Sequence, residues 1–448
     1  MHSASPDDPV SRVAAELTAR HPHVMIPDLT RMRALVDLLG NPQRAYPSIH
    51  LTGTNGKTST ARMIDALLRA HDLRTGRYTS PHLESVTERI AIDGEPITPE
   101  RLGEVWDEIA PLVALVDESH EERMTFFEVG TGLAFAAFAD APVDVAVVEV
   151  GLGGAWDATN VIEAGTAVIT PVDLDHTQML GDTVREIAAE KAGIVHAGAT
   201  LVLAAQHPEA AEPILERAAE VGARVVAEGR DIAVVERRIA VGGQLLTLGT
   251  RAATYEDVLL PLHGAHQAHN ALLALAAVES FLGGRALDGD VVRDGFAAAD
   301  SPGRLEIVRS SPTILLDGAH NPAGARALRT ALEEAFDFGR LIAVVGMLAD
   351  KDAAGFLEQL GPVVEHVIAT APRSPRALPA DDLAAIAADV LGEDAVSVAQ
   401  SLPDAIDRAV AEADVAFAET GQLGGVGVLI TGSLVTVGEA RALLRRMP

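Results

Sequence analysis

The chain has 448 residues, more than one hydrophobic core usually covers, and 48% of them are hydrophobic, so we expect two globular domains, or three. Its formal net charge of -29 at pH 7 argues against a nucleic-acid-binding protein, because such proteins cluster Lys and Arg against the phosphate backbone. An acidic protein can still bind anionic small molecules in a locally basic site. The absence of cysteine excludes disulfides, thiol nucleophiles and Cys-ligated zinc.

Features that the chain lacks suggest its location. Residues 1–9 are polar, without the basic region and apolar core of a secretory signal. No stretch approaches the ~20 consecutive apolar residues that a membrane-spanning helix needs. We therefore expect a cytoplasmic, soluble monomer with no membrane partner.

A glycine loop lies between a predicted apolar strand and a predicted helix. Residues 50–59 read HLTGTNGKTS, with a G-x-x-G-K-T spacing two residues shorter between the glycines than the common P-loop. Gly53 and Gly56 allow backbone N–H groups to point at an anion, and Lys57 adds a positive charge. Thr58 places a hydroxyl within reach of a metal on the phosphates. The alternative is a plain turn with an N-capping threonine.

Two later segments have simple structural explanations when taken alone. Ser80-Pro81 is a loop signal, and the adjacent His82 is explained as a surface histidine. Residues 125–138 form an apolar, Ala-rich helical run, whose aromatic side chains are explained first as core packing.

Two predicted strands end in polar side chains. Residues 143–150 are almost all β-branched or small, as in a parallel strand covered on both faces, and Glu149 stands at its carboxyl end. Ligands of open α/β sheets gather at that edge, where this carboxylate could hold Mg²⁺. The strand 166–170 leads to His176, which the same geometry places near Glu149. A structural hydrogen-bonding role for His176 is the alternative.

A predicted helix that begins near Thr183 ends in Glu190-Lys191-Ala192-Gly193, with Gly193 as its C-cap. Lys191 is explained simply as a charge that interacts with the helix dipole. A partly buried lysine with a lowered pKa can instead be carbamylated by CO₂, which turns it into a carboxylate-like metal ligand.

The remaining chain continues this alternation. Residues 232–262 indicate antiparallel hairpins, and residues 299–303 indicate a boundary. Beyond the boundary, strands and helices alternate as in a doubly wound sheet. Asp317 stands at a strand's carboxyl end, and His320 falls in the strand-to-helix loop that follows.

These patterns predict the fold class and the domains. We expect an α/β protein whose N-terminal domain, residues 1–300, is P-loop ATPase-like, with a mostly parallel sheet and a small antiparallel addition. Residues 301–303 would be a hinge. Residues 304–448 would form a smaller, Rossmann-like α/β domain.

Short motifs in one fixed order make the chain resemble the bacterial folylpolyglutamate synthase and dihydrofolate synthase family, a branch of the Mur ligases. The motifs cover nearly the whole chain. They are Gly53-Thr54-Asn55-Gly56-Lys57, Thr79-Ser80-Pro81-His82-Leu83, Thr125-Phe126-Phe127-Glu128, Glu149-Val150-Gly151-Leu152-Gly153-Gly154, Asp157-Ala158-Thr159-Asn160, Leu174-Asp175-His176, Glu190-Lys191-Ala192-Gly193-Ile194, Pro302-Gly303-Arg304-Leu305-Glu306 and Asp317-Gly318-Ala319-His320-Asn321-Pro322.

The resemblance implies an ATP-dependent carbon–nitrogen ligase that joins L-glutamate to dihydropteroate or to a folate. In this family the γ-phosphate of ATP goes to the substrate carboxylate, and the glutamate amine attacks the resulting acyl phosphate. Phosphorylation makes a carboxylate oxygen a good leaving group. Positioning and charge neutralisation would supply most of the catalysis of the phosphoryl transfer. ATP and two Mg²⁺ ions are the implied cofactors.

The resemblance also assigns residues by position. The implied ATP contacts are Gly53, Thr54, Asn55, Gly56, Lys57, Thr58, Asn270, Arg304 and Asp317. One Mg²⁺ would be held by Thr58, Ser80 and Glu149, and a second by His176 and carbamylated Lys191. The implied catalytic residues are Lys57, His176, Lys191 and His320, the last near the incoming glutamate. The implied folate-substrate contacts are His82, Thr125, Phe127, Asp157 and Ala158, where Phe127 could stack on a pterin and Asp157 could accept hydrogen bonds from it.

The chain departs from the family pattern at two places. Ala155-Trp156 stands where Arg-Leu is frequent, and Gly56-Lys57-Thr58-Ser59 replaces a frequent Gly-Lys-Gly-Ser. Two other hypotheses therefore remain: a Mur-type ligase acting on another carboxylate, such as a peptidoglycan precursor, and a nucleotide-dependent switch or binding module without ligase activity. Glu149, His176 and Lys191 argue against the module.

Overall fold

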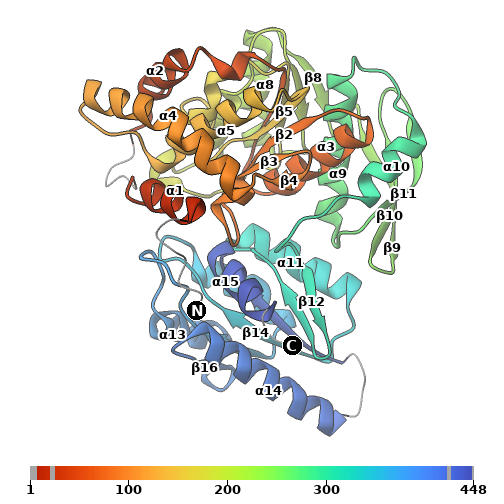
Figure 1. Ribbon diagram of the computed structural model, residues 1–448. Helices are drawn as coiled ribbons and strands as arrows, with labels where there is room; N and C mark the ends of the chain where they lie inside the picture. The colour runs from red at the N-terminus through yellow and green to blue at the C-terminus, as the bar shows by residue number, and fades with distance from the viewer. Residues whose placement is uncertain (1–7, 21–25, 421–424, 446–448) are drawn as a thin grey trace.

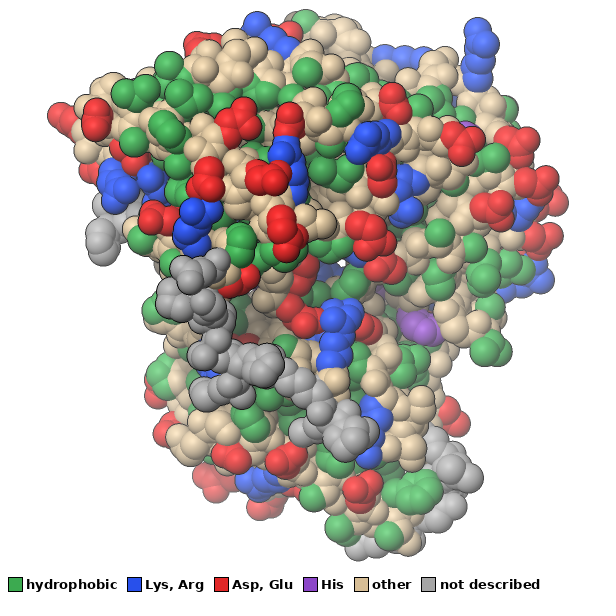
Figure 2. Space-filling model, in the orientation of Figure 1, with side chains coloured by type: hydrophobic (Ala, Val, Ile, Leu, Met, Phe, Trp, Pro, Cys, Tyr) green, Lys and Arg blue, Asp and Glu red, His purple; other side chains and the backbone are tan. Residues whose placement is uncertain are grey.

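A computed structural model describes residues 8–20, 26–420 and 425–445 of the chain. Residues 8 to about 300 form an upper lobe, and the described residues that follow form a lower lobe (Figure 1). Residues 1–7, on which the expectation about a secretory signal mostly rests, lie outside the described residues. On the face drawn in Figure 2, acidic and basic side chains are interspersed over both lobes, which meet at a narrower waist.

The upper lobe is built on a sheet that, within the described residues, has eight strands in the order β4-β3-β2-β5-β1-β6-β7-β8. Neighbours from β2 to β8 run parallel, while β3 and β4 are antiparallel additions at one edge. The bounds are β1 Ser48–Thr52, β2 Thr75–Tyr78, β3 Ile90–Ile92, β4 Glu95–Pro96, β5 Val145–Glu149, β6 Thr166–Ile169, β7 Thr200–Leu203 and β8 Arg224–Ala227.

Helices cover both faces of this sheet, which explains why the residues of β1 and β5 are all buried. Apolar side chains of α3, α9 and α10 pack on one face, and those of α1, α2, α4, α5, α7 and α8 pack on the other. The bounds are α1 Pro9–Thr18, α2 Thr30–Leu38, α3 Lys57–Ala70, α4 Pro99–Ser119, α5 Phe126–Asp140, α6 Thr177–Leu180, α7 Val184–Ala192, α8 Pro208–Glu220, α9 Ala265–Phe281 and α10 Gly289–Ala297.

The expected antiparallel addition is a three-stranded sheet in the order β11-β10-β9, with bounds β9 Ala233–Ala240, β10 Gly243–Gly249 and β11 Thr254–Leu260. Its buried side chains, such as Leu246 and Val258, join the core beneath α9. The outer strand β9 has only exposed and half-buried residues, because only one side of this small sheet is covered.

The lower lobe has a second sheet in the order β12-β13-β17-β14-β15-β16, parallel except for β12, and helices pack on both faces. The expected α/β class is thereby confirmed. The strand bounds are β12 Glu306–Ser310, β13 Thr313–Leu316, β14 Arg340–Val345, β15 His366–Ala369, β16 Val396–Val398 and β17 Val426–Thr431. The helix bounds are α11 Pro322–Ala335, α12 Ala353–Leu360, α13 Ala380–Leu391, α14 Leu402–Thr420 and α15 Leu434–Leu444.

The lobes touch closely where the loop after β2 meets α15. A Cβ on Gly438 would lie only 2.0 Å from the Leu83 carbonyl oxygen, so this approach requires glycine. Arg441 also reaches Glu84 of the upper lobe, at 2.5 Å. Glu306 accepts from the same guanidinium at 3.0 Å, which ties β12, α15 and the loop together.

A buried charge network fixes α3 against β2 and offers a test of stability. Asp65 is fully buried, and it accepts from Arg77 at 2.7 Å and from the Thr75 hydroxyl at 2.6 Å. Asp65→Ala should lower the free energy of unfolding by roughly 3–5 kcal/mol, because it leaves the buried Arg77 guanidinium unpaired. The exposed pair of Arg12 and Asp107 is the control. Asp107→Ala should change the free energy of unfolding by less than about 1 kcal/mol. Urea titrations followed by circular dichroism measure both, and equal effects would contradict the assignment.

Candidate active site

The glycine loop connects β1 to α3 and lies beside two other elements. Gly53 has φ +148°, and a Cβ there would lie 1.9 Å from Thr170 Oγ1; Gly56 has φ +89°, and its Cβ would lie 2.5 Å from Asn270 Oδ1. Both positions therefore require glycine. Gly56 is also the N-cap of α3, so the alternative of an N-capping threonine is wrong. The free N–H groups of the first helical turn suit an anion.

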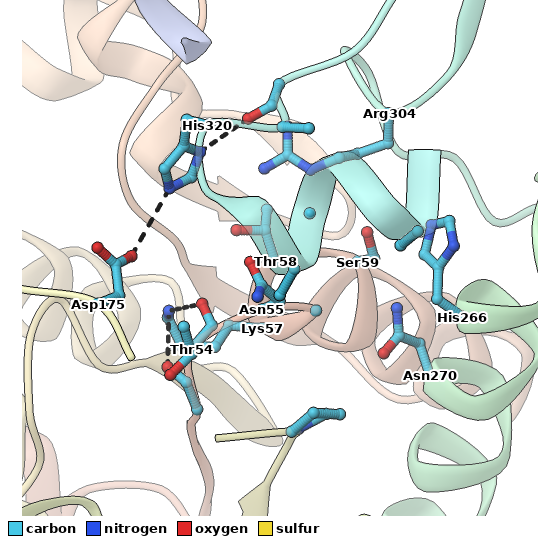
Figure 3. A pocket seen from close by; sticks show the side chains of 18 of the residues that line it. Thr54, Asn55, Lys57, Thr58, Ser59, Asp175, His266, Asn270, Arg304 and His320 are labelled. Atoms are coloured by element: carbon cyan, nitrogen blue, oxygen red, sulfur yellow. Dashed lines mark hydrogen bonds and ion pairs between the residues drawn. The ribbon is translucent and has the colours of Figure 1, made fainter. Parts of the chain in front are cut away.

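Lys57 is folded back onto this loop (Figure 3). Its ammonium donates to the carbonyl oxygens of Gly53, at 3.0 Å, and Thr54, at 3.2 Å. Burial lowers the pKa of Lys57, while the carboxylates of Glu149 and Asp175 oppose that shift. The lysine is thus a positive charge whose present partners are neutral carbonyls, which phosphate oxygens would outcompete.

Glu149, at the end of β5, faces the first turn of α3. Thr58 Oγ1 donates to both carboxylate oxygens, at 2.9 and 3.0 Å, and the Ser80 N–H lies 3.4 Å from one of them. Burial raises the pKa of Glu149 to about 7, although the positive charge of Lys57 opposes the shift. The structure therefore brings together the three residues expected at the first metal site.

The chemistry of these donors fits Mg²⁺ brought by a nucleotide. Among residues 8–20, 26–420 and 425–445, no group of three or more His, Asp or Glu side chains could hold a metal ion. The set around Glu149 has one carboxylate and the hydroxyls of Thr58 and Ser80. Mg²⁺ at such sites takes its remaining ligands from water and substrate phosphates, so a protein cage of carboxylates is not required.

Asp175 joins the two lobes beside this set. Lys351, in the loop after β14, donates to Asp175 Oδ1 at 2.6 Å and lies 3.5 Å from His176 Nε2. On the other side, His320 Nε2 is 3.8 Å from Asp175 Oδ2 (Figure 3). Burial works against ionisation of Asp175, but its contact with His320 and nearby positive charges hold its pKa well below the ordinary value.

Both histidines of this cluster turn Nε2 toward Asp175, each at 3.8 Å from Oδ2. His320 Nδ1 lies 2.8 Å from the Gly318 carbonyl oxygen, which only accepts, so Nδ1 carries a proton and Nε2 faces Asp175. Burial lowers the pKa of His176 to about 4, although Asp175 opposes the shift. The neutral imidazole of His176 has a lone pair available for a metal.

Lys191, in the last turn of α7, is a buried lysine that lacks a charge partner. Its side chain makes no hydrogen bond or ion pair with any other residue in the part of the chain that the structure describes. Burial, followed by the charge of Lys57, lowers the pKa of Lys191 to about 7. A dipole-bound surface charge does not explain a lysine that is only 4% exposed.

Gly193 follows α7 as expected, but for a different physical reason than a left-handed cap. Its φ of -59° is right-handed, so other residues could adopt it. A Cβ there would instead lie 2.4 Å from the Cβ of Ala155. Close packing of the α7 terminus on the Ala155 loop therefore requires this glycine.

The lower lobe contributes Asp317, which is buried, and Arg304, which is half-buried. Asp317 accepts from the backbone N–H groups of Leu305 and Ala319, each at 2.8 Å. Burial raises the pKa of Asp317 and lowers that of Arg304, and each charge opposes the other's shift. Asn321 also donates to Asn55 across the lobes, at 3.3 Å.

These groups line one cavity of about 480 Å³ between the lobes. Sequence-predicted residues that line it are Gly53, Thr54, Asn55, Gly56, Lys57, Thr58, Ser80, Glu149, His176, Lys191, Asn270, Arg304, Asp317 and His320. Those outside its lining are His82, Thr125, Phe127, Asp157 and Ala158.

The expected pterin residues form a separate group behind the Gly151 loop. Asp157 accepts from the N–H groups of Gly151 and Leu152, at 3.1 and 2.9 Å, and from the backbone and hydroxyl of Thr159. Its carboxylate therefore shapes the loop between β5 and the cavity. Thr125 caps α5 through Glu128, at 3.2 Å.

The two ring side chains of this group are also engaged. His82 Nδ1 accepts from Arg89 Nε at 2.8 Å, and burial lowers the pKa of His82 to about 4, so His82 is not an ordinary surface histidine. The Phe127 ring lies 5.8 Å from that of Tyr78. A Cβ on Gly151 would lie 2.5 Å from Phe127, so that ring packs directly on the loop.

Sequence reasoning missed Glu228 and His269, which line the same cavity, and Lys351, which donates to Asp175 in its lining. Lys351 follows β14 and Glu228 follows β8, so position at the carboxyl end of a strand is the signal that could have found them. His269 lies one residue before Asn270 on α9 and gave no separate signal.

Comparisons with known proteins agree with this geometry. Residues 51–278 match the Mur ligase middle domain, and residues 303–434 match the Mur ligase glutamate ligase domain. The chain is 51% identical, over 99% of its own length and 96% of the relative's, to the dihydrofolate synthase/folylpolyglutamate synthase of Mycobacterium tuberculosis. The chain belongs to the dihydrofolate synthase/folylpolyglutamate synthase family of Mur ligases. It is therefore an ATP-dependent acid–amino-acid ligase of folate metabolism, and the module hypothesis is wrong.

Solved structures of this family superimpose on the whole chain. The Mycobacterium tuberculosis folylpolyglutamate synthase complexed with ADP and AMPPCP has a TM-score of 0.94 and 52% identity, with 98% of this chain and 99% of that chain covered. The Escherichia coli FolC in complex with DHPP and ADP has a TM-score of 0.84 and 31% identity, with 99% and 100% covered.

The raised pKa of Glu149 predicts how metal binding depends on pH. With a pKa of about 7, the carboxyl is mostly ionised at pH 8 and mostly protonated at pH 6. Because Mg²⁺ needs the ionised form, its apparent affinity in the presence of ADP should fall roughly tenfold from pH 8 to pH 6. Isothermal titration with Mg²⁺ measures this. Glu149→Gln should bind weakly at both pH values; a wild-type affinity independent of pH would contradict the assignment.

Proposed function

We propose that the chain ligates L-glutamate to dihydropteroate, and to the γ-carboxylate of folate glutamates, through an acyl phosphate. The observation that supports this is one interlobe cavity with three kinds of group: a phosphate loop, an acidic and hydroxyl metal set, and two basic side chains, the buried Lys191 and the half-buried Arg304. The relatives' names include both activities. The relative from Escherichia coli was solved with DHPP and ADP.

In this proposal the phosphate loop holds ATP. Lys57 would leave the carbonyls of Gly53 and Thr54 for the phosphate oxygens. Thr58, Ser80 and Glu149 would hold one Mg²⁺ on those phosphates. Asn270, Arg304 and Asp317 complete the ATP contacts, and bound Mg²⁺ supplies charge neutralisation on the transferred group.

The reaction then follows in two balanced steps. A substrate carboxylate oxygen attacks the γ-phosphorus, the bond to the bridging oxygen breaks, and ADP leaves. The glutamate amine attacks the acyl carbon, loses a proton, and expels inorganic phosphate as the amide forms. His320, with Nε2 facing Asp175, is positioned to orient the incoming amine or take its proton.

We propose that Lys191 is carbamylated and, with His176, holds a second Mg²⁺. The neutral amine forms a bond to CO₂ and releases a proton, and the product is a carbamate with two oxygen donors. Burial without a charge partner and a pKa of about 7 supply the neutral amine that this needs. His176 and Lys191 line the same cavity as Glu149.

We propose that Thr125, Phe127, Asp157 and Ala158, with His82, form the pterin end of the folate site. Packing of Phe127 and Asp157 on the Gly151 loop supports this, because Gly151 and Leu152 themselves line the cavity. In the present geometry Asp157 acts on the pocket through that loop.

The proposed domains are residues 1–300 and 304–448, with a hinge at 301–303. The separate sheets on either side of these residues support the division.

A monomer is proposed because both lobes of one chain supply the site, and Mg²⁺, ATP and small substrates are its partners. No nucleic-acid partner is proposed, given the net charge of -29. A cytoplasmic location is proposed from the absence of cysteine. None of the helices in the described part of the chain combines the length and apolar character needed to cross a membrane.

The function is tested by phosphate release with ATP, Mg²⁺ and L-glutamate, with dihydropteroate and tetrahydrofolate in separate reactions. We expect phosphate release with each, and a product heavier by one glutamate residue by mass spectrometry. Reactions without glutamate are the control. Release with neither substrate would contradict the proposal and favour another carboxylate, with Ala155-Trp156 as the first place to look.

Lys191→Ala should lower turnover far more than nucleotide affinity, because it removes a metal ligand at the reacting carboxylate and leaves the phosphate loop intact. We expect a loss of at least the roughly 10- to 100-fold that removing a metal's supporting residue costs. Added acetate should restore part of the turnover by supplying a carboxylate. Carbon-13 NMR of the wild type with labelled bicarbonate should give a carbamate signal that the variant lacks. Equal turnover in both proteins would contradict the assignment.

A further inference from the structure

Glu228 and His269 line the end of the cavity remote from the glycine loop, and the proposed reaction uses neither. Glu228 directly follows β8, which lies three strands from β1 in the sheet order β1-β6-β7-β8. At the usual strand spacing this places Glu228 about 14 Å along the carboxyl edge from the phosphate loop. The Glu228 side chain is only 8% exposed, so the surrounding structure fixes its position.

Two donors orient the Glu228 carboxylate. The Ala205 N–H donates to Oε2 at 2.9 Å, and His269 Nδ1 makes a short hydrogen bond to Oε1. Burial raises the pKa of Glu228, but the hydrogen bond with His269 outweighs it, so the pKa is lowered and the group is ionised. Each oxygen keeps a further lone pair.

Part of the cavity lining is apolar. Ala327, Leu328 and Ala331 of α11 line the cavity, as do His266 and Asn270 of α9. A flat ring would be covered by the aliphatic side chains, while a buried carboxylate would repel phosphate groups strongly. Glu228 therefore suits the uncharged part of a nucleotide.

We infer that Glu228, held by His269, reads the nucleoside of the bound nucleotide by accepting a hydrogen bond from a ribose hydroxyl or from the exocyclic amine of adenine. The inference rests on the proposed occupancy of this cavity by ATP. A carboxylate accepts only, so its partner on the ligand must be a donor. Glu228 is thus a specificity residue, and His269 is a positioning residue.

The test measures binding of ADP, 2′-deoxyADP, 3′-deoxyADP and IDP to the full chain with Mg²⁺, by isothermal titration calorimetry. Wild type should bind ADP roughly 10- to 100-fold more tightly than the analogue that lacks the donor, because the analogue forms no hydrogen bond to this charged acceptor. In Glu228→Ala that ratio should fall to about one. Glu256→Gln, on the exposed face of β11, is the matched control and should keep the wild-type ratio.

The analogues identify the donor. Loss of discrimination against a deoxy analogue assigns the ribose hydroxyl, and loss against IDP assigns the adenine amine. Glu228→Gln offers a donor of its own, so in the second case it should gain affinity for IDP over ADP. His269→Ala should lower the same ratio, and His269→Gln, which keeps a donor, should restore it. Thermal melting confirms that the Gln variant, the smaller change, is folded.

Equal weakening of every nucleotide in Glu228→Ala, or unchanged ratios, would overturn the inference. Binding requires no glutamate or folate, so this outcome is independent of ligase activity. Nucleotide binding without ligation would contradict the proposed function. The affinity ratios would still test the role of Glu228, because they do not depend on ligation.

Discussion

The site buries several charged groups at one edge of a sheet, and each of these groups must be either paired or neutral. An unpaired buried charge costs several kcal/mol. The structure meets this constraint with partners that a ligand can replace: Lys57 donates to two loop carbonyls, and Glu149 accepts from the Thr58 hydroxyl. Neutral partners cost little to displace, so the arrangement keeps the loop ordered while reserving its charges for phosphates and metal.

Lys191 meets the same constraint in another way. It has no partner among the described residues, and burial shifts its pKa to about 7, so much of it is a neutral amine at physiological pH. His176 is likewise kept neutral by burial. Desolvation disfavours the charged form of each side chain and leaves a lone pair on its nitrogen, which is the form that nucleophilic or metal-ligating chemistry requires.

The two lobes complete one another. Lys351 and His320 of the lower lobe approach Asp175 of the upper lobe, and Asn321 donates to Asn55 in the phosphate loop. Away from the cavity, Arg441 pairs with Glu84, four residues after Ser80. The position of the lower lobe is therefore linked to both the glycine loop and the segment that carries Ser80. Movement of one lobe would change the geometry of the reacting groups, as expected for ligases that close over their substrates.

The sequence alone determined the strand, loop and helix around Gly53 and Gly56, the α/β class, and the location of Glu149 and Asp317 at strand ends, because period, glycine spacing and chain order are local signals. It also determined the family, through motifs in a fixed order. Only the tertiary structure decided that Lys351 reaches Asp175, that Gly193 is required by Ala155, and that Asp157 is engaged by its own loop. Two of those contacts join residues 38 and 176 positions apart, and the third turns a side chain toward its own backbone; neither spacing nor composition encodes such distances and directions.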